Sequence, residues 1–172
     1  NGMTISAWFN LSTFQASNFD GVQCILAKWY HVLNCGNNTD TYECSIAGNK
    51  AQFATNNNNI SGFPNPPALT ASDLNTWKHV VYITDPQLGQ MIYINGVQSG
   101  TSSATGAICA STNDLLFGAD QHISLGLERF FNGKLDDIGI WNRVLSASEI
   151  NSLYTGTVSS VGLQANPANA EP

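Results

Sequence analysis

The amino-acid sequence predicts an all-β protein, a two-layer antiparallel β-sandwich with jelly-roll connections and one short helix near the C-terminal end. Three observations lead to this prediction. Short runs of alternating apolar and polar residues recur along the chain. Turn-forming Gly, Asn, Asp and Pro separate these runs. One segment alone, at 146–154, has the apolar spacing of a helix.

The first predicted strand lies near the start of the sequence. Residues 3–11 read M-T-I-S-A-W-F-N-L, so every second side chain falls on one apolar face. Asn95-Gly96 is the strongest hairpin dipeptide, because both residues tolerate a positive φ. The other predicted strands cover 22–29, 42–47, 51–54, 77–84, 90–94, 115–117 and 133–141.

The helix and the loops complete the domain. Ser146 followed by Glu149 fits a capping box at the start of the helix. The proline-rich segment 56–67 is predicted to be a surface loop, since proline lacks the donor that a central strand needs. We expect the domain to cover residues 1–156. Residues 157–172 lose the core pattern and are predicted to form a Ser/Gly/Asn/Pro linker or tail.

The composition and charge of the chain argue against some classes of binding partner. Only 10% of the 172 residues are charged and 42% are hydrophobic, which is typical of extracellular β proteins. The net charge of −6 argues against nucleic acids and anionic membranes as partners, because both are bound through clustered Lys and Arg. No apolar run is long enough to cross a bilayer. The acidic balance is compatible with a cation such as calcium.

Four cysteines, Cys24, Cys35, Cys44 and Cys109, indicate two disulfides and an oxidising compartment. Free buried thiols are the alternative. A zinc site is disfavoured, since there is no C-x-x-C pair. Cys24 and Cys44 fall on strands predicted to be neighbours, which favours Cys24–Cys44 and leaves Cys35–Cys109.

Four segments, in this order, carry a family resemblance: T-I-S-A-W-F-N at 4–10, I-L-A-K-W to Y-E-C-S-I-A-G-N-K-A-Q-F at 25–53, W-K-H-V-V-Y to I-Y-I-N-G-V at 77–97, and F-N-G-K-L-D-D-I-G-I-W-N-R-V-L to S-L-Y at 131–154. Together they resemble the laminin-G-like jelly-roll family of the concanavalin-A-like lectin and glucanase group. The family usually begins with one more strand, which would lie upstream. The resemblance implies a secreted or cell-surface module, often appended to bacterial surface proteins or carbohydrate-active enzymes and joined to other domains of a longer chain.

Asp136 is the first candidate for a metal ligand. Simple alternation along 133–141 places it on the same face as Ile138 and Ile140, and an inward carboxylate needs a partner. The resemblance implies a structural calcium ion, with Asp120 as a second candidate ligand. The alternatives are that the Asp136 carboxylate accepts backbone N–H bonds or pairs with Arg143 or Lys134, and that Asp120 caps a turn.

A patch of aromatic and polar residues is the candidate glycan site. Aromatic rings stack on sugars, and Asn or Asp side chains bind hydroxyls. The candidate residues are Trp29, Tyr30, His31, Asn34, Asp40 and Phe63. The alternative is that Trp29 belongs to the core and that its loop is only solvated.

No catalytic residues are predicted. Glucanases of this fold carry paired acids on one strand, and none of the four glutamates has an acid at spacing two or four. We therefore predict a non-catalytic binding or adhesion module whose partner is a polysaccharide or another glycan. The alternative is a protein–protein adhesion or spacer domain that contacts a surface protein.

Overall fold

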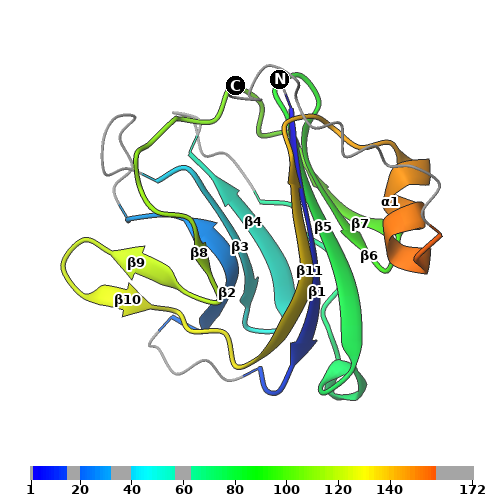
Figure 1. Ribbon diagram of the computed structural model, residues 1–172, viewed down its shortest axis with the longest axis horizontal. Coiled ribbons are helices and arrows are strands. Elements are labelled where there is room, and N and C mark those ends of the chain that lie inside the picture. Colours follow the sequence, from blue (N-terminus) through cyan, green and yellow to red (C-terminus); the bar gives the residue numbers. More distant parts are fainter. Residues whose placement is uncertain (1, 15–19, 32–39, 57–62, 158–172) are drawn as a thin grey trace, which may run out of the picture.

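Two antiparallel sheets lie face to face in the computed structural model, which describes residues 2–14, 20–31, 40–56 and 63–157 (Figure 1). The five-stranded sheet has the order β11 (Gly133–Trp141), β1 (Met3–Leu11), β5 (Trp77–Asp85), β6 (Gly89–Ile94) and β7 (Val97–Ser102). The four-stranded sheet has the order β4 (Lys50–Thr55), β3 (Tyr42–Ala47), β2 (Val22–Lys28) and β8 (Leu116–Phe117). This architecture confirms the predicted all-β sandwich.

The core lies between the two sheets. Phe9 of β1 and Tyr82 of β5 meet Leu26 and Phe53 from the opposite sheet, and all four side chains are almost completely buried. The rings of Phe53 and Tyr82 lie 5.5 Å apart. The hydroxyl group of Tyr82 donates a hydrogen bond of 3.3 Å to the Ser45 carbonyl, so its polar atom is satisfied inside the core.

Helix α1 (Ala147–Thr155) covers the outer face of the five-stranded sheet (Figure 1). Its buried Ile150 packs against Val81 and Ile83. The predicted capping box is confirmed: the Ser146 hydroxyl accepts a hydrogen bond from the Glu149 backbone, and the Glu149 carboxylate accepts one from the Ser146 backbone. No helix within the described ranges has the length and apolarity to cross a membrane.

Most predicted strands are confirmed, but the sequence does not predict four of the elements. Strand β7 follows the predicted Asn95-Gly96 turn, yet it is too polar to show alternation. Strands β9 (Asp120–His122) and β10 (Gly126–Glu128) form a separate hairpin beside β8 (Figure 1). The sequence predicts no strand for either segment, because three residues are too few for a periodic signal. The short 3₁₀ helix η1 (Ala71–Asp73) precedes β5.

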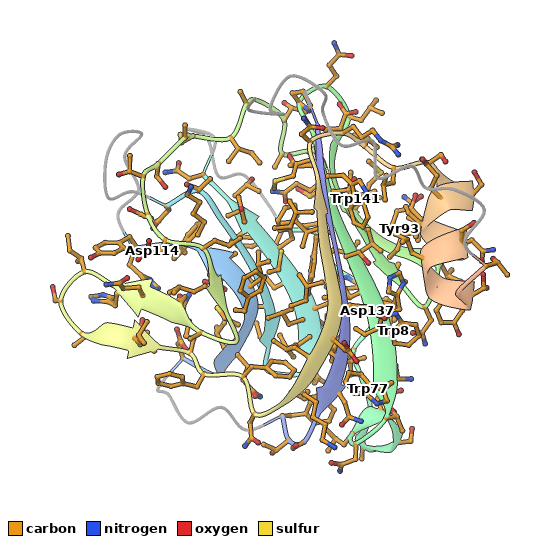
Figure 2. The ribbon with its side chains drawn as sticks, in the orientation of Figure 1. Trp8, Trp77, Tyr93, Asp114, Asp137 and Trp141 are labelled. Atoms are coloured by element: carbon orange, nitrogen blue, oxygen red, sulfur yellow. The ribbon has the colours of Figure 1, made fainter. Side chains whose placement is uncertain are left out.

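The inward orientation predicted for Asp136 is wrong. The pairing of β1 with β11 shifts between Ser6–Gly139 and Trp8–Asp136, which inserts one extra residue into β11. Asp137 has a φ of 45° at this bulge, halfway along β11 (Figure 2). Because the extra residue reverses the alternation, the Asp136 side chain is exposed and no inward calcium ligand arises there.

The Cys24–Cys44 disulfide is also wrong. Both residues are free thiols with no exposed surface. Cys44 belongs to the core between the sheets, whereas Cys24 packs with Trp29 on the other face of the same sheet. The pairing of β2 with β3 shifts between Cys24 and Leu26, and the two thiols face opposite ways. Cys109 is buried and Cys35 lies outside the described residues, so their disulfide stays a prediction.

Candidate functional site

A pocket of about 440 Å³ opens on the face of the four-stranded sheet that points away from the core. Its floor is made by side chains that alternate with core residues along three neighbouring strands: Val22, Glu43, Gln52 and Ala54. Its walls come from the strand ends, the adjoining loops and the segment after β10: Asp20, Trp29, His31, Asp40, Phe63 and Arg129. The pocket therefore combines two aromatic side chains with several charged ones.

Arg129 organises the charges of the pocket. Its Nε and Nη2 atoms lie 2.8 and 2.6 Å from Oδ2 of Asp20. Its Nη1 atom donates to Glu43 at 2.5 Å and to Asp120 at 3.2 Å. The Asp120 side chain has no exposed surface and that of Glu43 has 4%. Since a buried carboxylate is costly without a partner, this guanidinium is what allows both acids to lie inside the protein.

The buried acids and Arg129 shift one another's pKa values. Burial raises the pKa of Glu43 to about 6, although the Arg129 guanidinium pulls it down. Burial tends to lower the pKa of Arg129, but the charge of Glu43 and the hydrogen bond to Asp20 raise it further above its usual value. Arg129 is thus a permanent cation at the edge of the pocket.

His31 forms the second part of this arrangement. Its Nε2 atom lies 3.0 Å from Oδ2 of Asp120 and 3.2 Å from Oε1 of Glu128. Burial lowers the pKa of His31, but the hydrogen bond to Asp120 and the two nearby carboxylates raise it above its ordinary value overall. We call Asp20, His31, Glu43, Asp120, Glu128 and Arg129 the charged network.

The β9–β10 hairpin brings the network together. Asp120 and Glu128 are directly paired across the hairpin, so their carboxylates project from the same face toward His31. Arg129 follows β10 with a φ of 52°, and His31 follows β2 with a φ of 59°. Left-handed conformations are uncommon for such residues and carry strain, which the ion pairs of the network offset.

Four of the six predicted ligand-binding residues line this one pocket: Trp29, His31, Asp40 and Phe63. Trp29 is only 8% exposed, so it belongs largely to the packing of this face, whereas Phe63 is 43% exposed. The Tyr30 hydroxyl accepts a hydrogen bond from Gln121, outside the pocket lining. Asn34 lies outside the described residues.

Sequence reasoning missed Asp20, Glu43, Glu128 and Arg129 as members of the site. Glu43 carried the strongest available signal, because it is a charged residue on a strand of an otherwise low-charge chain. Arg129 is one of six basic residues, but nothing in its local sequence points to Asp20 or Glu43, which are far away along the chain. Arg129 forms its ion pairs with Asp20 and Glu43 only because the tertiary fold brings these distant segments together.

Two groups in the described part of the chain hold donor atoms within 4.8 Å of one another: Cys24, Glu43 and Asp120, and His31, Asp120 and Glu128. Oδ1 of Asp120 has no hydrogen-bond partner among the described residues, which a cation could satisfy. Calcium, however, prefers six to eight oxygen ligands. The first group includes the Cys24 thiol, and the second includes the His31 imidazole. Arg129 already pairs with Glu43 and Asp120. These residues do not fit calcium.

Glu43 and Asp120 are the closest approach to a catalytic pair. One carboxylate oxygen of each lies within 4.8 Å of the other, which is no farther than the roughly 5–5.5 Å between the acids of retaining glycosidases. A nucleophile must reach the sugar, and Asp120 has no exposed surface. Both carboxylates are also held by Arg129. The ion pairs with Arg129 stabilise the two buried carboxylates, and this arrangement does not favour hydrolysis of a glycosidic bond.

Comparisons with known proteins concern the family and the fold of the chain. A family model described as "Concanavalin A-like lectin/glucanases superfamily" matches residues 1–151. No curated protein matches the sequence.

Several solved structures share the fold. The native heptameric SAP-like pentraxin from Limulus polyphemus superimposes with a TM-score of 0.65 at 16% identity, covering 89% of this chain and 69% of that one. The Ruminococcus gnavus IT-sialidase CBM40 gives 0.67 at 14% identity over 90% and 83% of the two chains. The binding domain of botulinum neurotoxin DC in complex with SialylT gives 0.61 at 21% identity over 90% and 35%. At such identities the likeness concerns the fold.

Proposed function

The chain belongs to the concanavalin A-like lectin/glucanases superfamily, and from this premise we propose that it is a non-catalytic, extracellular module that binds carbohydrate in the pocket above the four-stranded sheet. The observation that carries the proposal is the convergence of Trp29, His31, Asp40 and Phe63 on one concave site. A pocket of about 440 Å³ lies within the range of small-ligand sites.

The residues around the pocket supply what a sugar needs. Phe63 offers an exposed aromatic face on which the apolar side of a pyranose ring can stack. Asp20, Gln52 and His31 offer polar groups to its hydroxyls. Two of the solved structures are named as a sialidase CBM40 and as a binding domain in complex with SialylT, which supports the idea that this fold accommodates glycan recognition.

Calcium is not required by this proposal. The residues that the resemblance pointed to do not assemble an oxygen cage, since Asp136 is exposed and the acids at the pocket face Arg129 and His31. The extracellular setting rests on the low charge of the chain and on the predicted Cys35–Cys109 disulfide.

A glycan array followed by calorimetry on the best ligand tests the proposal. Phe63→Ala should weaken binding about fivefold, through loss of stacking worth roughly 1 kcal/mol. Trp77→Ala is the matched control, because Trp77 is also 43% exposed but begins β5 in the other sheet, away from the pocket lining (Figure 2). Equal effects of the two substitutions, or no binding to any glycan, would refute the proposal.

Protein–protein adhesion is a second candidate, because one region of the surface exposes several large apolar side chains. Exposed apolar side chains gather on β8 and on the β9–β10 hairpin and its flanks: Phe117, Ile123, Leu125, Leu127 and Phe130, each more than half exposed. An apolar surface of this kind favours contact with another protein. Replacing Leu125 and Leu127 by Ser would abolish such contact while leaving glycan binding unchanged.

A further inference from the structure

We propose that the pocket selects sugars by charge: it accepts glycans that are neutral or carry a protonated amine, and it rejects glycans that carry a carboxylate. This inference rests on the proposed function, since it names the class of carbohydrate that the same pocket takes. Two features of the pocket favour such selection: its surplus of negative charge and the pairing of Arg129 with acids of the protein.

Acids outnumber cations at this site. Five carboxylates line the pocket or lie directly behind it: Asp20, Asp40, Glu43, Asp120 and Glu128. Arg129 and His31 are the positive groups that face them among the described residues. Five negative charges against two positive ones leave a surplus of three, even when His31 is protonated. A bound carboxylate would therefore enter a field of its own sign.

Arg129 does not provide an anion site despite its position in the pocket wall. Its Nε and Nη2 atoms face Asp20, and its Nη1 atom faces Glu43 and Asp120. A carboxylate on the ligand would have to displace one of these partners, and the displaced acid would lose its compensating charge. The guanidinium is thus occupied by the acids of the protein itself.

The charge of His31 is likewise paired with acids of the protein. Its Nε2 atom is shared between Asp120 and Glu128, at 3.0 and 3.2 Å. A protonated amine on the ligand is expected to be attracted instead, because Asp20 lines the pocket and its side chain is 21% exposed. Oδ2 of Asp20 faces Arg129, but Oδ1 accepts a bond of 3.2 Å from the Val22 backbone, and a carboxylate oxygen can accept a second. One unit charge about 6 Å away, at an effective dielectric between those of water and protein, changes affinity roughly tenfold.

Matched sugars test the inference. Oligomers of glucose, glucosamine and glucuronate, and of galactose, galactosamine and galacturonate, would be titrated into the full chain near neutral pH at low and at high salt. We expect the amino or neutral oligomer to bind at least tenfold tighter than its carboxylate counterpart, with a smaller difference at high salt. A carboxylate oligomer that binds as tightly as its neutral counterpart overturns the inference and leaves the proposed function intact. Absence of binding by all six overturns both.

Asp20→Asn provides an independent readout. The substitution removes one acid from the rim and releases the Nε–Nη2 edge of Arg129. We expect the ratio of carboxylate to neutral affinity to rise about tenfold in this variant. Asp137→Asn is the control with the same change in net charge, since Asp137 is exposed on β11 and asparagine tolerates its positive φ (Figure 2). A ratio that moves equally in both variants, or in neither, contradicts the assignment.

Discussion

The Nη1 atom of Arg129 lies 3.2 Å from Oδ2 of Asp120, a carboxylate that has no exposed surface. The same nitrogen donates to Glu43, which is almost as deeply buried. This contact joins the β9–β10 hairpin to the outer face of the four-stranded sheet, and it shapes one wall of the pocket. Stability and the proposed binding site therefore depend on one guanidinium.

Arg129→Ala should be among the most destabilising single substitutions in the chain. It leaves Glu43 and Asp120 buried without their cation, which costs about 3–5 kcal/mol. Urea unfolding monitored by tryptophan fluorescence would measure the change. Arg143→Ala is the control, because the Arg143–Glu149 pair is exposed and solvent screening leaves it little effect on stability. If the two variants lost similar stability, the network would not have the role assigned to it.

Stability should fall between about pH 6.5 and pH 4 because of His79. This residue is 1% exposed and its Nε2 atom lies 2.8 Å from the Ser6 hydroxyl oxygen. Burial lowers its pKa to about 4, so the unfolded chain takes up a proton at a higher pH than the folded protein does. Stability is complete above the unfolded pKa and decreases as the pH falls toward the folded one, by roughly 3 kcal/mol in all.

The contribution of His79 can be separated from that of the other titrating groups. His79→Gln keeps a side chain that can bond to Ser6 but removes the proton. The difference in the free energy of unfolding between wild type and variant should shrink as the pH is lowered from 7 to 4. Parallel pH profiles of the two proteins would contradict the prediction.

The native protein should contain no reactive thiol. Cys24 and Cys44 are completely buried, and burial raises the pKa of each well above its ordinary value. We expect no labelling by a thiol reagent in native buffer and two labelled cysteines after denaturation without reductant. Four labelled residues would disprove the Cys35–Cys109 disulfide, and peptide mapping of the unreduced protein would identify its partners directly.

Chelation should leave both binding and stability unchanged. The acids at the pocket are compensated by Arg129 and His31, and Asp136 is exposed on β11. Neither glycan affinity nor the melting temperature should respond to EDTA or to added calcium. A melting temperature that rises with calcium in the manner of a specific ligand would show that an oxygen cage forms elsewhere in the chain.

The sequence alone indicates some residues of the candidate site and not others. Trp29 and Phe63 were recognisable as aromatic residues next to polar loops, and His31 and Asp40 lie in the same stretch of sequence as Trp29. The pairing of Arg129 with Glu43 was not recognisable, because the two residues are 86 positions apart in the chain. The orientation of Asp136 was predicted wrongly, since a bulge of one residue in β11 is silent in the sequence and reverses every following side chain.

By itself the sequence determined the two-layer β architecture, most strand positions, the capped helix and the scarcity of charge. These are local properties: alternation, turn chemistry and capping act between residues only a few positions apart. The tertiary structure alone decided which face each cysteine occupies, where Asp136 points and which acids Arg129 neutralises. Those outcomes depend on strand register and on pairing between distant segments. A buried charge is unfavourable without an opposite charge beside it, and only the fold determines which opposite charge lies close enough.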